Sequence, residues 1–196
     1  MSYWFQMIKL PPKLAKRPFS TAEAVAEGIS KASLSRMAKA GILERLSRGV
    51  YRVEGSDDST GEDSYQMATL RCGQPSAICL LSAMEHYHVT DQISKQIWVL
   101  VPATKRVAAK DLKLIRSRDP MWDIGISKTK GYWITTLPRT LVEGLLYKRL
   151  IGHRVAIAAL KQALAQRKVN LGQVVDMANK LGVAHRIRPI IEALGS

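Results

Sequence analysis

Two short segments near the start of the chain have apolar residues at the spacing of an α-helix. The first, residues 22–27, follows Ser20 and has Glu23 in its first turn, a combination that favours the start of a helix. Gly28 then supplies the permissive backbone that a sharp turn requires. The pattern predicts a short helix that ends in a glycine turn.

A second helix is predicted between Ser30 and Gly41. Ser30 is a favourable N-cap, and Gly41 stands where a left-handed C-terminal cap belongs. One face of the segment is apolar and contains Leu34, Met37 and Ala38. The opposite face carries short and basic side chains, which are Ala32, Ser35, Arg36 and Lys39, flanked by Lys31 and Ser33.

The residues after this helix predict a β-hairpin. Strands are expected over 42–46 and 50–53, with a turn at 47–49 in which Gly49 takes the position that needs a positive φ. Helix, glycine turn, helix and basic-tipped hairpin is the order of a winged helix-turn-helix. We therefore predict that residues 1–54 form a winged helix-turn-helix domain.

The rest of the chain alternates apolar strands with helices and then becomes helical. Strands are predicted at 77–79, 96–101, 113–118 and 131–135, and helices at 65–72 and 81–87. From Arg139 onward the spacing is helical, in segments at 140–150, 155–166, 171–181 and 187–194. The predicted fold class is α+β, an N-terminal winged helix-turn-helix followed by a mixed α/β C-terminal domain with a helical end.

Charge divides the chain into similar parts. The 196 residues contain 30 Lys and Arg against 16 Asp and Glu, which is a net charge of +14. Residues 1–54 carry +6 and residues 64–196 carry +12, whereas 55–63, rich in Gly, Ser and Thr, carry −4. We expect 55–63 to be an acidic linker and 64–196 a basic C-terminal domain, although a surface loop inside one domain would have the same composition as this linker.

A large positive charge favours a polyanionic partner, and nucleic acid is the leading candidate. Anionic membrane is the rival, but no apolar run approaches the roughly eighteen residues of a spanning helix. The first residues lack the basic-then-apolar order of a signal peptide, and Cys72 and Cys79 fit neither a disulfide framework nor a zinc site. We expect a cytoplasmic protein that does not bind membranes and has two buried cysteines.

In a winged helix-turn-helix, the second helix enters the major groove of duplex DNA. Short polar side chains let that helix approach the base edges closely, while arginine and lysine reach guanine or phosphate. The predicted DNA contacts are Lys31, Ser33, Ser35, Arg36 and Lys39 in the helix, and Arg45, Ser47, Arg48 and Arg52 in the hairpin. The alternative interpretation is that these residues are ordinary solvated side chains.

Signals for catalysis or metal binding are weak. His86 and His88 lie two apart where a helix is predicted to end, without a clear set of further ligands. Asp111 and Lys113 have the spacing of a nuclease strand, but the apolar strand that precedes them carries no acid. Phosphate loops, serine elbows and dinucleotide fingerprints are absent from the sequence. We expect no enzyme activity, no metal and no cofactor.

The segment 30–52, which ends in Gly49-Val50-Tyr51-Arg52, resembles the N-terminal winged helix of the AbiEi family of antitoxins and transcriptional regulators. A looser similarity continues at 81–90, in the strand around Trp98 and at 135–143. The resemblance implies the antitoxin of a type IV toxin–antitoxin system, which represses its own operon through the winged helix. It also implies functional pairing with a nucleotidyltransferase-like toxin, without a stable complex between the two proteins.

Other functions remain open for the same sequence. A stand-alone transcriptional repressor would share the winged helix and differ only in lacking a toxin. The neutralising role falls to the C-terminal domain, whose candidate surface includes Arg139, Thr140 and the basic terminal helices. An RNA-binding module and a degenerate nuclease are further alternatives, which RNA competition and a magnesium-dependent cleavage assay would distinguish.

Overall fold

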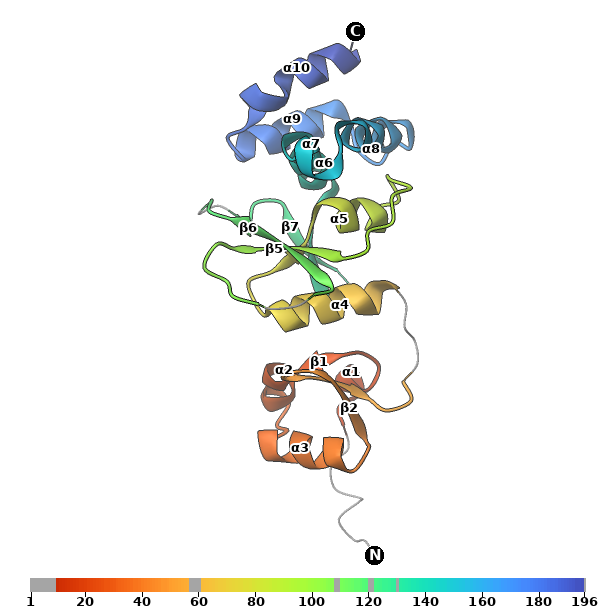
Figure 1. Ribbon diagram of the computed structural model, residues 1–196, viewed down its shortest axis with the longest axis vertical. Coiled ribbons are helices and arrows are strands. Elements are labelled where there is room, and N and C mark those ends of the chain that lie inside the picture. The colour runs from red at the N-terminus through yellow and green to blue at the C-terminus, as the bar shows by residue number, and fades with distance from the viewer. Residues whose placement is uncertain (1–9, 57–60, 108–109, 120–121, 130, 196) are drawn as a thin grey trace, which may run out of the picture. The chain divides into compact units, whose positions relative to one another are not determined.

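The computed structural model describes residues 10–56, 61–107, 110–119, 122–129 and 131–195 (Figure 1). The chain forms two compact units, Met1–Gly73 and Gln74–Ser196, and each is described by itself. Residues 57–60 of the predicted acidic linker lie outside the described residues.

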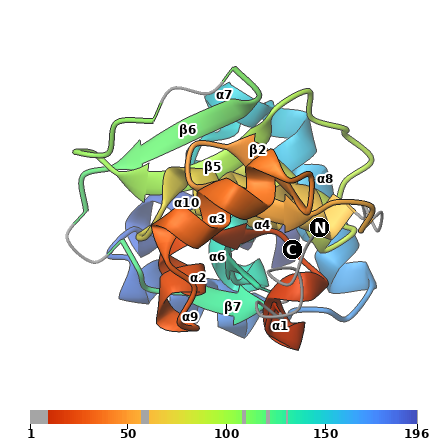
Figure 2. The same ribbon diagram turned by 90° about the horizontal axis from the view of Figure 1, so that it is seen from below.

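The first unit combines short helices with a small antiparallel sheet. Its described elements are α1 (Pro12–Ala15), β1 (Phe19–Ser20), α2 (Thr21–Ala26), α3 (Lys31–Lys39), β2 (Leu43–Ser47), β3 (Val50–Val53) and α4 (Gly61–Cys72). Helix α3 contacts both α2 and β2, as Figure 2 shows. This is the predicted winged helix-turn-helix, with α2 and α3 as its helix pair and the β2–β3 hairpin as its wing.

Capping residues fix where α2 and α3 begin and end. Ser20 Oγ accepts a hydrogen bond from the Glu23 N–H at 3.1 Å, and the Glu23 carboxylate accepts one from the Ser20 N–H at 2.8 Å. This reciprocal pair satisfies two backbone donors that the first turn of a helix leaves open. Gly28 and Gly41, after the two helices, have φ of +84° and +71°. Both predicted glycine turns are therefore confirmed.

The wing is attached to the start of α2. Gly49 has a φ of +77°, as predicted, and its carbonyl accepts a hydrogen bond from the Thr21 N–H at 2.8 Å. The pairing of β2 with β3 shifts between Arg45 and Ser47, which is a bulge that turns the wing tip. Strand β1 pairs with the other edge of β3 and was not predicted, because two residues show no alternation.

The core of the first unit lies between its helices and one face of the sheet. It contains Leu14, Phe19, Ala24, Ile29, Leu34, Met37, Leu43 and Tyr51. All of these side chains are at most 9% exposed, so this small unit has a core of its own.

Helix α4 belongs to the first unit. It contacts β1 and β3, and Gln66, which is 2% exposed, donates from Nε2 to the Pro18 carbonyl at 2.9 Å. The compact units therefore divide after Gly73, whereas the composition of the chain predicts the boundary within 55–63. Composition marks where the chain lacks apolar side chains. It does not reveal that the next helix buries polar residues, here Gln66 and Thr69, in the unit that precedes it.

The second unit contains a five-stranded mixed sheet with the order β6-β5-β4-β8-β7. The strands are β4 (Ala77–Ile78), β5 (Ile97–Pro102), β6 (Leu112–Ser117), β7 (Ile126–Thr129) and β8 (Tyr132–Thr135). Pairs β5–β6 and β4–β8 are parallel, and the other two pairs are antiparallel. The four predicted strands are confirmed. Strand β7 was missed because Ile126 is its one apolar residue, as suits a short edge strand.

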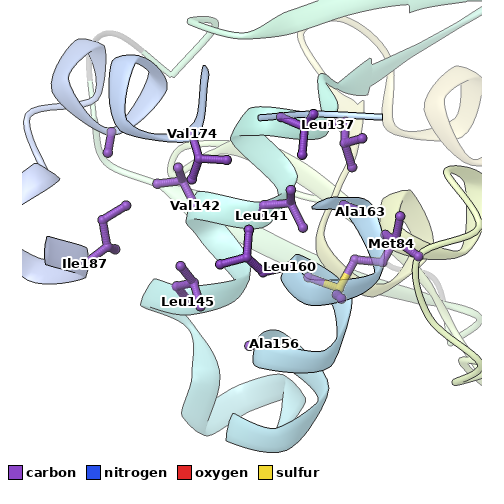
Figure 3. Packing of buried hydrophobic residues seen from close by; sticks show 14 residues of the cluster. Met84, Leu137, Leu141, Val142, Leu145, Ala156, Leu160, Ala163, Val174 and Ile187 are labelled. Atoms are coloured by element: carbon purple, nitrogen blue, oxygen red, sulfur yellow. The ribbon is translucent and has the colours of Figure 1, made fainter. Parts of the chain in front are cut away.

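Helices pack beside this sheet and form the end of the chain. They are α5 (Leu80–His86), α6 (Leu137–Leu146), α7 (Lys148–Ile151), α8 (His153–Ala165), α9 (Leu171–Lys180) and α10 (Ala184–Gly195). Helix α6 contacts α5, α8, α9 and α10. Leu141, Val142 and Leu145 of α6 lie among apolar side chains of these helices (Figure 3). The predicted helical end is thus confirmed, with the segment 140–150 divided between α6 and α7.

Candidate nucleic-acid interface

Helix α3 has one buried face and one exposed face. Leu34 and Met37 are buried in the core of the first unit. The exposed face, which we call the α3 surface, consists of Lys31, Ala32, Ser35, Arg36 and Lys39. Residues three and four apart lie on the same side of a helix, so these side chains form one continuous surface. Two of them are small, and three of them are cationic.

Ser33, another predicted DNA contact, lies inside this arrangement. It is only 9% exposed, and its Oγ lies 2.9 Å from the Ser30 Oγ at the start of α3. Arg36 donates from Nη2 to the Ser33 Oγ at 3.3 Å. The two serines and Arg36 form a chain of hydrogen bonds from the N-cap to a guanidinium on the α3 surface. Ser33 is therefore mostly buried, and its hydroxyl positions Arg36.

The wing supplies two more exposed cations. Arg45, in β2, and Arg48, in the turn, are both exposed. Ser47 lies between them and is partly buried, and its Oγ has no hydrogen-bond partner among the described residues. This hydroxyl is buried, so Ser47 cannot contact a ligand from this position, unlike the two arginines.

Arg52 is placed differently from the other predicted contacts. Its Nη2 donates to the Glu44 Oε2 at 2.7 Å across the hairpin, and its side chain is 22% exposed. Adjacent residues of a strand point to opposite faces. Arg52 therefore points away from the face on which Tyr51 contacts the core. The structure brings the other five predicted cations to the surface and holds this one in an ion pair.

Three acidic side chains of the first unit form ion pairs with cations outside the α3 surface and the wing tip. Glu23 pairs with Arg17 at 2.9 Å, Glu27 with Lys13 at 3.8 Å, and Glu44 with Arg52. Among the described residues, no carboxylate forms an ion pair with the remaining cations, which are Lys31, Arg36, Lys39, Arg45 and Arg48. Five positive charges are therefore left for an external anion.

The candidate surface around Arg139 and Thr140 in the second unit is buried. These residues are 3% and 0% exposed, so neither side chain can contact a partner from this position. Arg139 donates from Nε to the Glu143 Oε1 at 3.0 Å and from Nη1 to the carbonyls of Trp122 and Ile124. Burial raises the pKa of Glu143, and the neighbouring guanidinium of Arg139 opposes that rise. Removal of either partner would leave the other charge buried without a counter-charge.

The weak catalytic candidates also have structural partners. His86 Nδ1 lies 3.1 Å from the Tyr132 hydroxyl, and Lys113 Nζ lies 4.1 Å from the ring centroid of Trp98. Within the described residues, no three His, Cys, Asp or Glu side chains are grouped to hold a metal ion. No helix in the described part is both long and apolar enough to cross a membrane. Cys72 and Cys79 are buried free thiols, as predicted.

Comparison with known proteins finds a matching family model and similar solved structures. Curated proteins provided no match to this sequence. The solved structure of the RV2827C protein from Mycobacterium tuberculosis has a TM-score of 0.52 and 13% identity, over 83% of this chain and 66% of that one. This similarity supports the fold of the chain, which spans slightly less than two thirds of the length of that protein. The model of the family described as "Transcriptional regulator, AbiEi antitoxin" matches residues 11–53, the part of this chain that forms the winged helix.

Proposed function

We propose that this protein is a transcriptional regulator that binds duplex DNA through the α3 surface and the wing. The observation that carries the proposal is the separation of charge in the first unit. Glu23, Glu27 and Glu44 pair with cations elsewhere, and among the described residues five exposed cations on α3 and the wing form no ion pair with a carboxylate. In a winged helix-turn-helix these are the elements that meet the major groove and the neighbouring backbone.

The side chains of the α3 surface suit the reading of bases. Ala32 and Ser35 are short, so the helix backbone can approach the floor of the groove, and Arg36 can form a bidentate contact with guanine. Arg45 and Arg48 would contact phosphates, which position the protein without reading sequence. We infer that base preference comes mainly from α3 and salt dependence mainly from the wing.

The first test is binding to the DNA upstream of the protein's own gene. Arg36→Ala and Lys39→Ala should each weaken this binding by about 1–3 kcal/mol, as expected for a lost base contact. Lys16→Ala is the matched control, because Lys16 is an exposed cation of the same unit outside the α3 surface. Unchanged affinity in both α3 variants would show that α3 does not read DNA. Stronger competition by structured RNA than by duplex DNA would favour the RNA-binding alternative.

We further propose that the protein represses its own operon and acts as the antitoxin of a type IV toxin–antitoxin system in the cytoplasm. The description of the matching family, a transcriptional regulator and antitoxin, supports this proposal. The toxin would be a nucleotidyltransferase-like protein that does not form a stable complex with the antitoxin. On this proposal the chain is not an enzyme and needs no cofactor, and the second unit carries the neutralising function.

Co-expression with the neighbouring gene tests the antitoxin function. The full chain should restore growth, whereas residues 1–73 alone should repress transcription without protecting the cell. The fragment ends at Gly73 because α4 packs on the first unit. Protection by residues 1–73 alone would assign neutralisation to the first unit. A neighbouring gene that is not toxic would leave a stand-alone repressor as the function.

A further inference from the structure

The second unit has an open hollow of about 590 Å³ lined by Ala103 and three arginines, Arg106, Arg116 and Arg118. Arg116 lies in the edge strand β6, Arg118 follows the end of that strand, and Arg106 lies in the loop after β5. The sequence pattern does not distinguish these arginines, because Arg106 and Arg118 are twelve positions apart in a segment that is rich in basic residues.

Backbone hydrogen bonds hold the loop that carries Arg106. The Ala103 N–H donates to the Ser117 carbonyl at 2.8 Å, which joins the start of the loop to the end of β6. Arg106 Nη1 donates to the carbonyls of Ala103 and Lys105 at 3.0 and 3.4 Å. Lys105 instead turns toward Gln74, whose carbonyl accepts from Nζ at 2.7 Å. These hydrogen bonds hold the Arg106 guanidinium through Nη1. Its Nε and Nη2 can therefore donate to an anion.

The positive charge of the hollow is not neutralised within the described part of the chain. All three arginines are exposed, and no described carboxylate forms an ion pair with any of them. Three guanidinium groups around one hollow repel one another, and an anion that contacts all three would relieve this repulsion. Arginine binds phosphate oxygens through two parallel hydrogen bonds, so phosphate is the anion that fits these donors best.

The shape of the site favours linked phosphates over a duplex backbone. Duplex DNA is a convex rod, and each strand carries one phosphate per roughly 3.4 Å of the helix axis. Few of these phosphates can enter a hollow together. A linear polyphosphate can enter a hollow and bring several phosphate groups to three arginines at once. Among the described residues that line the hollow, none has an aromatic side chain on which a base could stack. We propose that this hollow binds linked phosphate groups, either inorganic polyphosphate or the phosphate chain of a nucleoside triphosphate.

Isothermal titration of the full chain with sodium tripolyphosphate, at about 0.15 M salt, tests the proposal. Tripolyphosphate should bind at least about tenfold more tightly than orthophosphate, because linked groups engage the arginines together. The double variant Arg116→Gln/Arg118→Gln should lower tripolyphosphate affinity at least about tenfold. Arg149→Gln/Arg154→Gln removes the same charge from exposed positions of the second unit and should change affinity less than about twofold. Circular dichroism and thermal melting check that both variants are folded.

ATP and an unrelated DNA duplex complete the experiment. Equal affinities for ATP and tripolyphosphate would identify the phosphates alone as the ligand, and tighter binding of ATP would identify a nucleotide. Both results support the site. The proposal is overturned if both double variants lose tripolyphosphate binding equally, or if tripolyphosphate binds no better than orthophosphate. Loss of duplex binding in the Arg116/Arg118 variant, without any tripolyphosphate binding, would instead assign these arginines to a nucleic-acid backbone.

Discussion

Arg36 in the first unit and Arg139 in the second show two opposite uses of an arginine on a helix. Arg36 is exposed, and a hydroxyl of Ser33 supports it from one side. Arg139 is 3% exposed, and its guanidinium contacts the Glu143 carboxylate and two backbone carbonyls. The difference lies in the acceptors within reach. Helix α3 offers a neutral hydroxyl, so the charge of Arg36 remains available. Around Arg139, α6 supplies a carboxylate and the turn before β7 supplies two carbonyls, so its charge is compensated inside the fold.

The largest expected effect comes from breaking the buried pair. Arg139→Ala should lower the free energy of unfolding by about 3–5 kcal/mol, because three buried acceptors lose their donor. Urea denaturation followed by tryptophan fluorescence would measure it. Arg149→Ala, at an exposed position of the same unit, should change stability by less than about 0.5 kcal/mol. A similar loss in both variants would mean that Arg139 has no special structural role.

The contrast between Arg36 and Arg139 also shows which features of the structure the sequence predicts. The helices, the wing and its glycine turns were predictable, because caps, periodicity and positive-φ positions are local signals. Burial of Arg139 was not, since Glu143 lies one turn away but the Trp122 and Ile124 carbonyls arrive from a loop far along the chain. Local spacing placed Arg36 and Ser33 on α3, yet it could not show that only Arg36 faces solvent.

A smaller effect should sharpen the picture of the exposed arginine. Ser33→Ala removes the acceptor that holds the Arg36 guanidinium and should weaken operator binding by about 0.5–1.5 kcal/mol, the usual net contribution of one hydrogen bond. Combining Ser33→Ala with Arg36→Ala separates a positioning role from a direct contact. If Ser33 acts through Arg36, the double variant should bind no more weakly than Arg36→Ala alone. Fully additive losses in the double-mutant cycle would indicate that Ser33 contacts DNA by itself.

The smallest expected effect concerns the pH dependence of the buried pair. Burial places the pKa of Glu143 in the folded protein above its ordinary value, although Arg139 limits the rise. The unfolded chain therefore loses this proton at a lower pH than the folded chain does. Stability contributed by the protonated carboxyl is fully present below the ordinary carboxyl pKa and is lost as pH rises through the higher folded pKa.

Glu143→Gln cannot titrate, so the wild type should lose stability relative to this variant as pH increases across that window. Urea midpoints measured for both proteins at a series of pH values would test the sign, and a wild-type advantage that grows with pH would show that Arg139 outweighs burial at this site.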